Sequence, residues 1–325
     1  MTEPAPGPQQ GRFIIVGGAG FIGSHFTDRL LADRQTEAVT LYDNFSSGRD
    51  WHFEHHLNDR RLTVIRADAG DVEKLSAAMD GLDVVIHLAA NPDIARAVTE
   101  PAIDFDEGTV LSHTVLEAMR RSGCGRILYA SGSGIYGDLG DTDVCEDHGP
   151  LRPISTYGAS KLASEALISA YCHMFGLDGC IFRFGNVIGP RQTHGVGYDF
   201  IRKLRRDPSR LEILGDGNQS KPYIHVDDVV SAVLFANANS KDALGIYNVA
   251  PNDAISVRDI ADLVVEQLGL GKDSVDYVFS GGERGWSGDV PVVRLNCDRI
   301  NKLGWTCQDQ SLTAMRRALA ALVDE

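Results

Sequence analysis

The stretch from residue 13 to residue 23 decides the fold and reads Phe13-Ile14-Ile15-Val16-Gly17-Gly18-Ala19-Gly20-Phe21-Ile22-Gly23. Four consecutive apolar residues are typical of a strand that is buried on both of its faces. The glycines that follow have the spacing G-x-x-G-x-x-G, which allows a sharp turn and a close approach of the backbone to a pyrophosphate at the start of a helix. The stretch therefore predicts a strand, a turn and a helix that bind a nucleotide. A strand-to-helix turn without a ligand is the alternative.

A carboxylate follows where such a nucleotide site needs one. The second predicted strand covers residues 39–42 and leads into Asp43, roughly 20 residues beyond the glycines, where it can accept hydrogen bonds from an adenosine ribose. Asn44 comes next, and no arginine directly follows Asp43 to neutralise a 2′-phosphate. The pattern therefore predicts NAD rather than NADP.

Length and charge exclude several classes of protein. The 325 residues can form one large domain or two closely joined ones, and the formal net charge of -14 disfavours a nucleic-acid-binding surface. No apolar run approaches the roughly 18 residues of a membrane span, and no signal peptide is recognisable, so we expect a cytoplasmic protein without a membrane segment. The six cysteines form no C-x-x-C pair, which predicts reduced structural thiols and no metal site.

Predicted strands and helices alternate through the first half of the chain. Strands are expected at residues 13–16, 39–42, 62–65, 84–87 and 127–129, and helices at residues 21–33, 72–79 and 102–122. Alternation of this kind implies right-handed crossovers and a parallel sheet covered on both faces. The predicted fold class is therefore α/β, a doubly wound parallel sheet, with ligands beyond the carboxyl ends of its strands.

The alternation breaks down after residue 183, where loops rich in Gly, Pro, Asp and Asn separate short elements. Residues 215–218 predict a turn between two short strands, and residues 226–228 predict the start of a capped helix. Apolar spacing predicts two packed surface helices, at residues 256–268 and 310–324. This smaller α/β half is expected to close over the first half.

Tyr157 and Lys161 form the sharpest catalytic pattern. They are four residues apart on a helix predicted over residues 155–175, so they share one face with about 6 Å between their β-carbons. An ammonium beside a phenol favours the phenolate and lowers its pKa, which makes the tyrosine a usable base near neutral pH. The lysine can also donate to a nucleotide ribose. A chance meeting of the two side chains on a helix surface is the alternative.

The order of these motifs resembles that of the extended short-chain dehydrogenase/reductases, in particular the nucleotide-sugar epimerase and dehydratase branch. From residue 12 onward the chain most resembles the UDP-glucose 4-epimerases. The motifs that carry the resemblance are the glycine loop, Asp43, Asp68, His87-Leu88-Ala89-Ala90, Ile135-Tyr136-Gly137, Tyr157, Lys161, residues 183–191, residues 215–217 and Gly304-Trp305.

The resemblance implies a Rossmann domain over residues 12–184 that binds NAD. Residues 185–325 would mainly bind a nucleoside diphosphate sugar, with segments near residues 221–237 and 246–250 returning to the Rossmann domain. Residues 1–11 are expected to form a disordered tail. The NAD contacts implied are Gly17, Gly20, Phe21, Ile22, Gly23, Asp43, Asn44, Gly48, Asp68, Ala69, Leu88, Ala89, Ala90, Tyr157 and Lys161.

The substrate contacts implied are Asn186, Arg191, Lys221 and Arg284. The three cations are assigned to the diphosphate because two phosphates in an acidic protein need positive charge nearby. Each of these assignments has a structural alternative. The cations could be ordinary surface residues, and Asn186 could stabilise a loop turn. Among the NAD contacts, Asp68 could instead cap the helix that follows it.

Two positions depart from the family pattern. The family places a serine or threonine four residues before the tyrosine of its V-Y-G turn, and here that position is Gly132. Ser133, through a shifted backbone, is our candidate for the missing hydroxyl. The alternatives are that Tyr157 works without a hydroxyl and that a different reaction has relaxed the need for one. The related dehydratases carry an Asp-Glu pair where this chain has Ser133 and Gly134, which disfavours dehydration. The second departure is Phe105, where many relatives have an asparagine.

The resemblance implies epimerisation at C4 of a nucleoside diphosphate hexose through a transient 4-keto sugar, with Tyr157 as the base and no net consumption of NAD. Three alternatives stay open: another 4-keto-sugar reaction at C3 or C5, decarboxylation of a uronate or dehydration, or a protein that binds NAD or a nucleotide sugar without catalysis. The helices near residues 102–122 and 155–175 resemble those that pair two subunits in this family, so we expect a homodimer.

Overall fold

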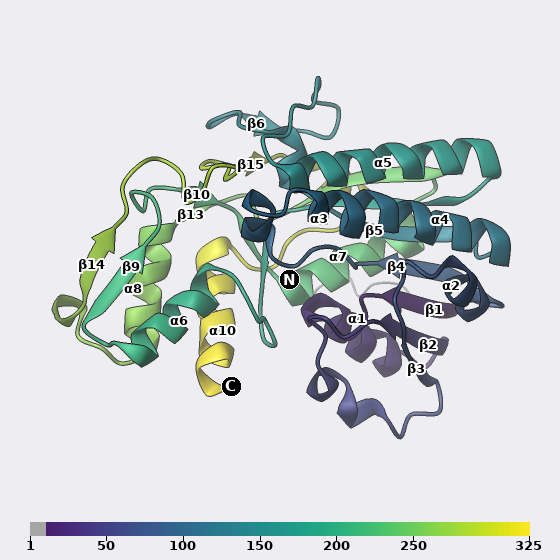
Figure 1. Cartoon of the computed structure of the whole chain (residues 1–325), viewed down its shortest axis with the longest axis horizontal. Helices are drawn as coiled ribbons and strands as arrows, with labels where there is room; N and C mark the ends of the chain where they lie inside the picture. Colours follow the sequence, from purple (N-terminus) through teal and green to yellow (C-terminus); the bar gives the residue numbers. More distant parts are fainter. Residues whose placement is uncertain (1–10) are drawn as a thin grey trace.

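The computed structural model describes residues 11–325. Its centre is a parallel sheet of seven strands in the order β12-β7-β5-β4-β1-β2-β3 (Figure 1). The tail expected at residues 1–11 lies outside the described residues except for Gly11, where β1 begins. The strands are β1 (Gly11–Val16), β2 (Thr36–Asp43), β3 (Leu62–Arg66), β4 (Val84–His87), β5 (Arg126–Gly132), β7 (Asp178–Phe184) and β12 (Leu244–Val249). The α/β doubly wound fold is confirmed.

Helices cover both faces of this sheet because its central strands are apolar on both sides. One face packs against α1 (Phe21–Ala32) and α7 (Val226–Asn239) in a core that includes Phe26 and Val229. The other packs against α2 (Val72–Met79), α4 (Leu111–Ser122) and α5 (Thr156–Phe175). Figure 1 shows the two layers, with α4 and α5 on the side opposite α1 and α7.

The helix expected over residues 102–122 is interrupted. A short helix α3 (Ala102–Asp104) runs into a π-helical segment η4 (Phe105–Val110), and only then does α4 begin. A π-helical turn carries an extra residue, which rotates the side chains that precede it relative to those that follow. This rotation decides which side chains near residue 105 point inward.

The second half packs around its own apolar core. The elements of this core are α6 (Val196–Arg206), β9 (Arg210–Ile213), α8 (Val257–Gln267), β14 (Asp276–Phe279) and α10 (Ser311–Asp324). They lie together at one end of the molecule (Figure 1). Residues 215–218 do connect two strands, but β9 pairs with β14, whereas β10 (Ser220–Lys221) pairs with β13 (Ile255–Ser256).

Two further pairs of strands are present, and the second of them joins the two halves. The strand β8 (Asn186–Ile188) pairs with β11 (Tyr223–His225), and β6 (Asp143–Val144) pairs with β15 (Arg294–Leu295). The short helix α9 (Asp298–Leu303) and the 3-10 turns η1 (Asp50–His52), η2 (Glu54–His56), η3 (Ile94–Val98), η5 (Ser133–Tyr136) and η6 (Lys272–Ser274) complete the element order. Among the described residues, no helix is both long and apolar enough to cross a membrane.

Candidate active site

The glycine loop packs tightly against the end of β4. Gly17 has a positive φ of 85°, and a Cβ atom there would lie 2.8 Å from the backbone nitrogen of Ala89, so only glycine fits. The nitrogens of Leu88 and Ala89 both donate to the Val16 carbonyl, at 2.9 and 3.0 Å. Gly20 then immediately precedes α1, which begins at Phe21. The carboxyl ends of β1 and β4 therefore form one continuous surface beside a helix N-terminus.

Asp43 closes the other side of this loop. Its buried carboxylate accepts hydrogen bonds from the nitrogen of Ala19 at 2.9 Å and from that of Phe45 at 2.7 Å. Burial raises the pKa of Asp43, and these two hydrogen bonds oppose the increase. Gly48 packs against Ala19, where a Cβ would come within 2.8 Å of the alanine side chain. Because each carboxylate oxygen has two lone pairs, Asp43 retains acceptor capacity for ribose hydroxyls.

Asn44 and Asp68 contact each other at the edge of the same surface. Asn44 Nδ2 donates to Asp68 Oδ2 at 3.2 Å, and the nitrogen of Gly70 donates to Asp68 Oδ1 at 2.7 Å. The residue that caps α2 is Asp71, which accepts from the Lys74 nitrogen at 3.1 Å. The helix-capping alternative for Asp68 is therefore wrong, and its carboxylate is exposed.

His52 packs against the glycine loop. Its Nδ1 lies 2.8 Å from the Ala19 carbonyl oxygen. Its Nε2 is buried and has no hydrogen-bond partner among residues 11–325.

Tyr157 and Lys161 meet on the first turns of α5, as the sequence predicts. The Lys161 ammonium lies 5.5 Å from the centre of the Tyr157 ring and 5.0 Å from that of Tyr129. It donates a hydrogen bond to the Ala130 carbonyl at 2.7 Å. Burial lowers the pKa of Lys161 to about 8. The pair thus lies beside the end of β5.

The expected decrease in the pKa of Tyr157 is not observed. Burial, assisted by the negative charge of Asp104, raises the pKa of Tyr157 to about 12. The physical reason is that the Lys161 ammonium is directed at a backbone carbonyl, so desolvation of the phenolate outweighs its attraction to the cation. In this state the tyrosine is a phenol at neutral pH.

Asp104 is a site residue that sequence reasoning missed. Its carboxylate is buried and accepts hydrogen bonds from Asn91 Nδ2 at 2.8 Å and from Thr156 Oγ1 at 2.7 Å. Phe105, which we considered as the departure from the family asparagine, is 58% exposed. The π-helical turn thus places Asp104 inward, where it supports the start of the tyrosine helix.

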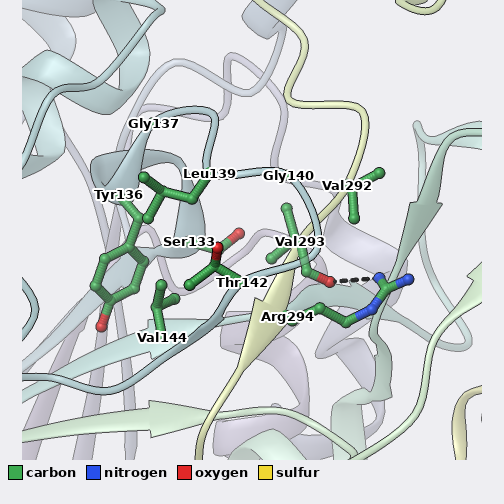
Figure 2. A pocket seen from close by; sticks show the side chains of 10 residues that line it. All are labelled: Ser133, Tyr136, Gly137, Leu139, Gly140, Thr142, Val144, Val292, Val293 and Arg294. Carbon is green, nitrogen blue, oxygen red and sulfur yellow. Dashed lines mark hydrogen bonds between the residues drawn. The ribbon is translucent and has the colours of Figure 1, made fainter.

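The three residues around Gly132 have different surroundings. Ser131 Oγ donates to the buried Glu165 Oε1 at 2.5 Å, so this hydroxyl is already used. Gly132 has an extended backbone with φ -158°, and a Cβ there would meet no atom within 4 Å. Ser133 points into a small hollow beside Thr142 and Val293 (Figure 2). Among residues 11–325, no hydrogen bond joins the side chains of Ser133 and Tyr157.

A buried ion pair holds the strands and the helix of the site together. Arg183 of β7 and Glu165 of α5 are 4% and 5% exposed, and Arg183 Nη2 lies 2.8 Å from Glu165 Oε2. Arg183 Nη1 also donates to the Tyr136 hydroxyl at 2.9 Å, which in turn donates to Asn248 Oδ1 at 2.7 Å. The network therefore links β7, α5, η5 and β12.

The proposed substrate residues fall into two groups. Lys221 pairs with Asp289 at 2.5 Å, and Arg284 donates to the Asp289 carbonyl at 2.6 Å and to Asp138 Oδ2 at 2.5 Å. Asn186 belongs to the same region, because its nitrogen donates to the carbonyl of Pro222, the residue after Lys221. An anionic ligand that binds Lys221 or Arg284 must compete with these acidic partners.

Arg191 has a different set of contacts. Its Nη2 lies 2.7 Å from Asp28 Oδ2 of α1, and its backbone nitrogen donates to Glu325 Oε1 at 2.9 Å. Its Nη1 is buried without a hydrogen-bond partner in the described part of the chain. The structure therefore does not bring Arg191 into the contacts shared by Lys221 and Arg284.

Comparison with known proteins agrees with this geometry. The NAD dependent epimerase/dehydratase family matches residues 13–250. The chain is 31% identical over 320 residues to a UDP-glucose 4-epimerase of Mycolicibacterium smegmatis, with 96% of this chain and 97% of that protein covered. A crystal structure of a UDP-galactose 4-epimerase has a TM-score of 0.85 at 36% identity, with 96% of this chain and 99% of that chain covered.

A dehydratase has a similar fold at lower sequence identity. The structure of a dTDP-glucose 4,6-dehydratase from Streptomyces venezuelae, with NAD bound, has a TM-score of 0.88 at 26% identity, with 96% of this chain and 97% of that chain covered. The chain therefore belongs to the NAD-dependent epimerase/dehydratase family, whose members act on nucleotide sugars, and its cofactor is NAD. The glycine loop and Asp43 fit this cofactor.

Proposed function

We propose that the protein interconverts a nucleoside diphosphate hexose and its C4 epimer. The observation that carries this proposal is the position of Tyr157 and Lys161, which lie beside the end of β5 at the same sheet edge as the glycine loop. At that edge, a proton acceptor and a nicotinamide cofactor can act on the same carbinol carbon. The similarity to UDP-glucose 4-epimerases supports a uridine nucleotide as the substrate carrier.

The residues then have the following roles. NAD supplies reversible hydride transfer at C4 of the sugar. Tyr157 is a phenol in this structure, and its phenolate form is the one that accepts the proton of the C4 hydroxyl, so that a 4-keto sugar forms. Lys161 stabilises that phenolate. Asn186 and the cations of the second half hold the nucleotide end while the keto sugar turns its other face. Tyr157 finally returns the proton to the C4 oxygen, and the oxidation state of the sugar is unchanged.

Two features near β5 favour epimerisation over dehydration. Loss of water across C5 and C6 needs an acid and a base close to those carbons. Ser133 occupies the first of the corresponding positions and points into the hollow of Figure 2. Gly134 occupies the second and packs against Gly158, where an added Cβ would lie 3.7 Å from the Gly158 Cα. Neither residue supplies a carboxylate.

We assign NAD binding to residues 12–184 and nucleotide-sugar binding mainly to residues 185–325. Two segments of the second half belong structurally to the first: β12 extends the seven-stranded sheet, and α7 covers one of its faces. We also assign Lys221 and Arg284 to the diphosphate, because their side chains bring positive charge to an acidic protein. Arg191, which we expected beside them, is paired with Asp28 instead and is left out of this assignment.

We further propose that two chains associate through α4 and α5. Large apolar side chains are exposed on α5, at Met174 and Phe175, and on the π-helical segment that leads into α4, at Phe105 and Val110. Exposed apolar groups of this size are typical of protein interfaces. Light scattering of the purified protein should give twice the mass of one chain, and a mass of 35.2 kDa would contradict the dimer.

The reaction is tested by incubating the purified protein with UDP-glucose or UDP-galactose in D2O and following the products by proton NMR. We expect inversion at C4 without incorporation of solvent deuterium. Deuterium at C3 or C5 would instead indicate an enolised keto sugar. Absence of turnover with retention of NAD would favour the binding-protein alternative.

A matched pair of variants tests the role of the base. Tyr157→Phe should lower kcat by about 100-fold or more and leave NAD binding intact. Tyr277→Phe removes a hydroxyl that bonds to Asp262, between β14 and α8, and should retain full activity. Equal activity of both variants would contradict Tyr157 as the base.

A further inference from the structure

Two consecutive histidines and one aspartate converge outside the candidate active site. His55 and His56 lie on η2, in the long connection between β2 and β3, and Asp28 lies on α1. His55 Nε2 is 3.0 Å and His56 Nε2 is 2.7 Å from the same carboxylate oxygen, Asp28 Oδ1. The two imidazole rings lie next to each other, with their centres 4.1 Å apart. Three potential ligand atoms therefore lie within 4.8 Å of one another.

The two carboxylate oxygens of Asp28 have different partners. Arg191 contacts only the second oxygen, Oδ2, at 2.7 Å. The first oxygen, Oδ1, is therefore the one that faces both imidazoles.

We propose that Asp28, His55 and His56 bind a divalent transition-metal ion, with Zn²⁺ as the best match. Two imidazole nitrogens and one carboxylate oxygen are a common ligand set for this ion, and water fills the remaining position. Metal–ligand bonds of about 2.0–2.1 Å place neighbouring ligands about 3.3 Å apart in a tetrahedral site. The observed 2.7 and 3.0 Å separations need only a small outward movement of side chains that are partly exposed.

The sequence predicted no metal site because the six cysteines form no metal-binding pattern. The proposed site uses none of these cysteines. Histidines separated from their carboxylate partner by a whole strand form no spacing motif, so only the fold reveals them. Bound metal would tie η2 to α1. Because Arg191 holds the same carboxylate from the loop after β8, the ion would also adjoin that loop.

The proposal is tested by titrating the chelator-treated full chain with Zn²⁺ and measuring bound metal by competition with a chromophoric chelator. We expect one saturable site per chain. The substitutions His56→Gln and Asp28→Asn should each weaken it at least tenfold, whereas His173→Gln, which changes an exposed histidine on α5, should not. The thermal midpoint without metal should be similar for all variants, which separates ligand loss from misfolding.

Substitution with Co²⁺ identifies the ligand atoms. Nitrogen and oxygen ligands give visible d–d bands without the intense near-ultraviolet band of a cobalt–thiolate bond. A thiolate band would place the metal on a cysteine and overturn the proposal. So would an absence of saturable Zn²⁺ binding in the wild-type protein, or equal affinity in the wild type and His56→Gln. None of these readouts depends on turnover, so they are independent of the proposed epimerase reaction.

Discussion

The carboxylate of Asp104 accepts a hydrogen bond from the Thr156 hydroxyl at 2.7 Å, and Thr156 directly precedes Tyr157. The same carboxylate contributes to the raised pKa of that tyrosine. Asp104 therefore has two opposed effects on the proposed base: it holds the N-terminus of α5 in place, and its charge disfavours the phenolate.

Replacing Asp104 with Asn should separate these two effects. An amide keeps the shape and can still bond to Asn91 and Thr156, but it removes the negative charge. We expect the rising limb of the pH profile of kcat/KM to move to lower pH and the rate at neutral pH to increase severalfold. Asp104→Ala, which removes the hydrogen bonds as well, should instead lower the rate. An unchanged pH profile for Asp104→Asn would contradict the electrostatic role.

Gly132→Ser should restore a hydroxyl at the position where the family carries one. The extended backbone and the open space at this position accept a side chain without strain. A hydroxyl that bonds to the reacting C4 oxygen should raise kcat by about tenfold or more. Gly132→Ala adds the same Cβ without the oxygen and is the control. Equal rates for the two variants would show that the reaction does not use a hydroxyl there.

Glu165→Gln should destabilise the fold by about 3–5 kcal/mol, because it leaves the buried Arg183 cation without its counter-charge. Urea unfolding followed by circular dichroism measures this change. The exposed pair of Glu266 and Arg316 is the matched control, and Glu266→Gln should have little effect. Similar destabilisation by the two substitutions would mean that burial of the first pair has no energetic consequence.

His87 should make the protein less stable in acid. Burial, with a contribution from Lys161, lowers the pKa of His87 to about 3 from its ordinary value of 6.5. Between pH 6.5 and pH 3, His87 is protonated in the unfolded chain but stays neutral in the folded chain. The free energy of unfolding therefore decreases as the pH falls through this range, by up to about 1.4 kcal/mol for each pH unit. Unfolding free energies measured across this range should depend less on pH in His87→Asn. Equal slopes would contradict the assignment.

The sequence predicted the elements whose signal is local. The apolar run at residues 13–16 and the glycines after it carry strand, turn and helix within one short stretch, and each expected strand of the first half is present. The spacing of Tyr157 and Lys161 likewise needs only one helix. Asp43 could be predicted as a nucleotide-binding residue because it is a carboxylate at the end of a predicted strand.

Features that depend on contacts between distant segments could not be predicted. The inward position of Asp104 follows from a π-helical turn, which has no clear sequence signature. The expected decrease in the pKa of Tyr157 was wrong. The helical spacing indicates that Lys161 is close, but it does not indicate how far the packed fold removes the phenol from water. Asp28 and His56 meet only because the connection between β2 and β3 folds back onto α1.

The order of strands β12 and β7 has a consequence for synthesis of the chain on the ribosome. β12 completes the sheet edge beside β7, and α7 covers a face of the same sheet, yet both follow β8, α6 and β9 along the chain. A nascent chain that ends at residue 184 would therefore expose the edge of β7 and the apolar residues that α7 later buries. The nucleotide-binding half cannot finish folding before much of its partner half has been made, so the two halves mature as one cooperative unit.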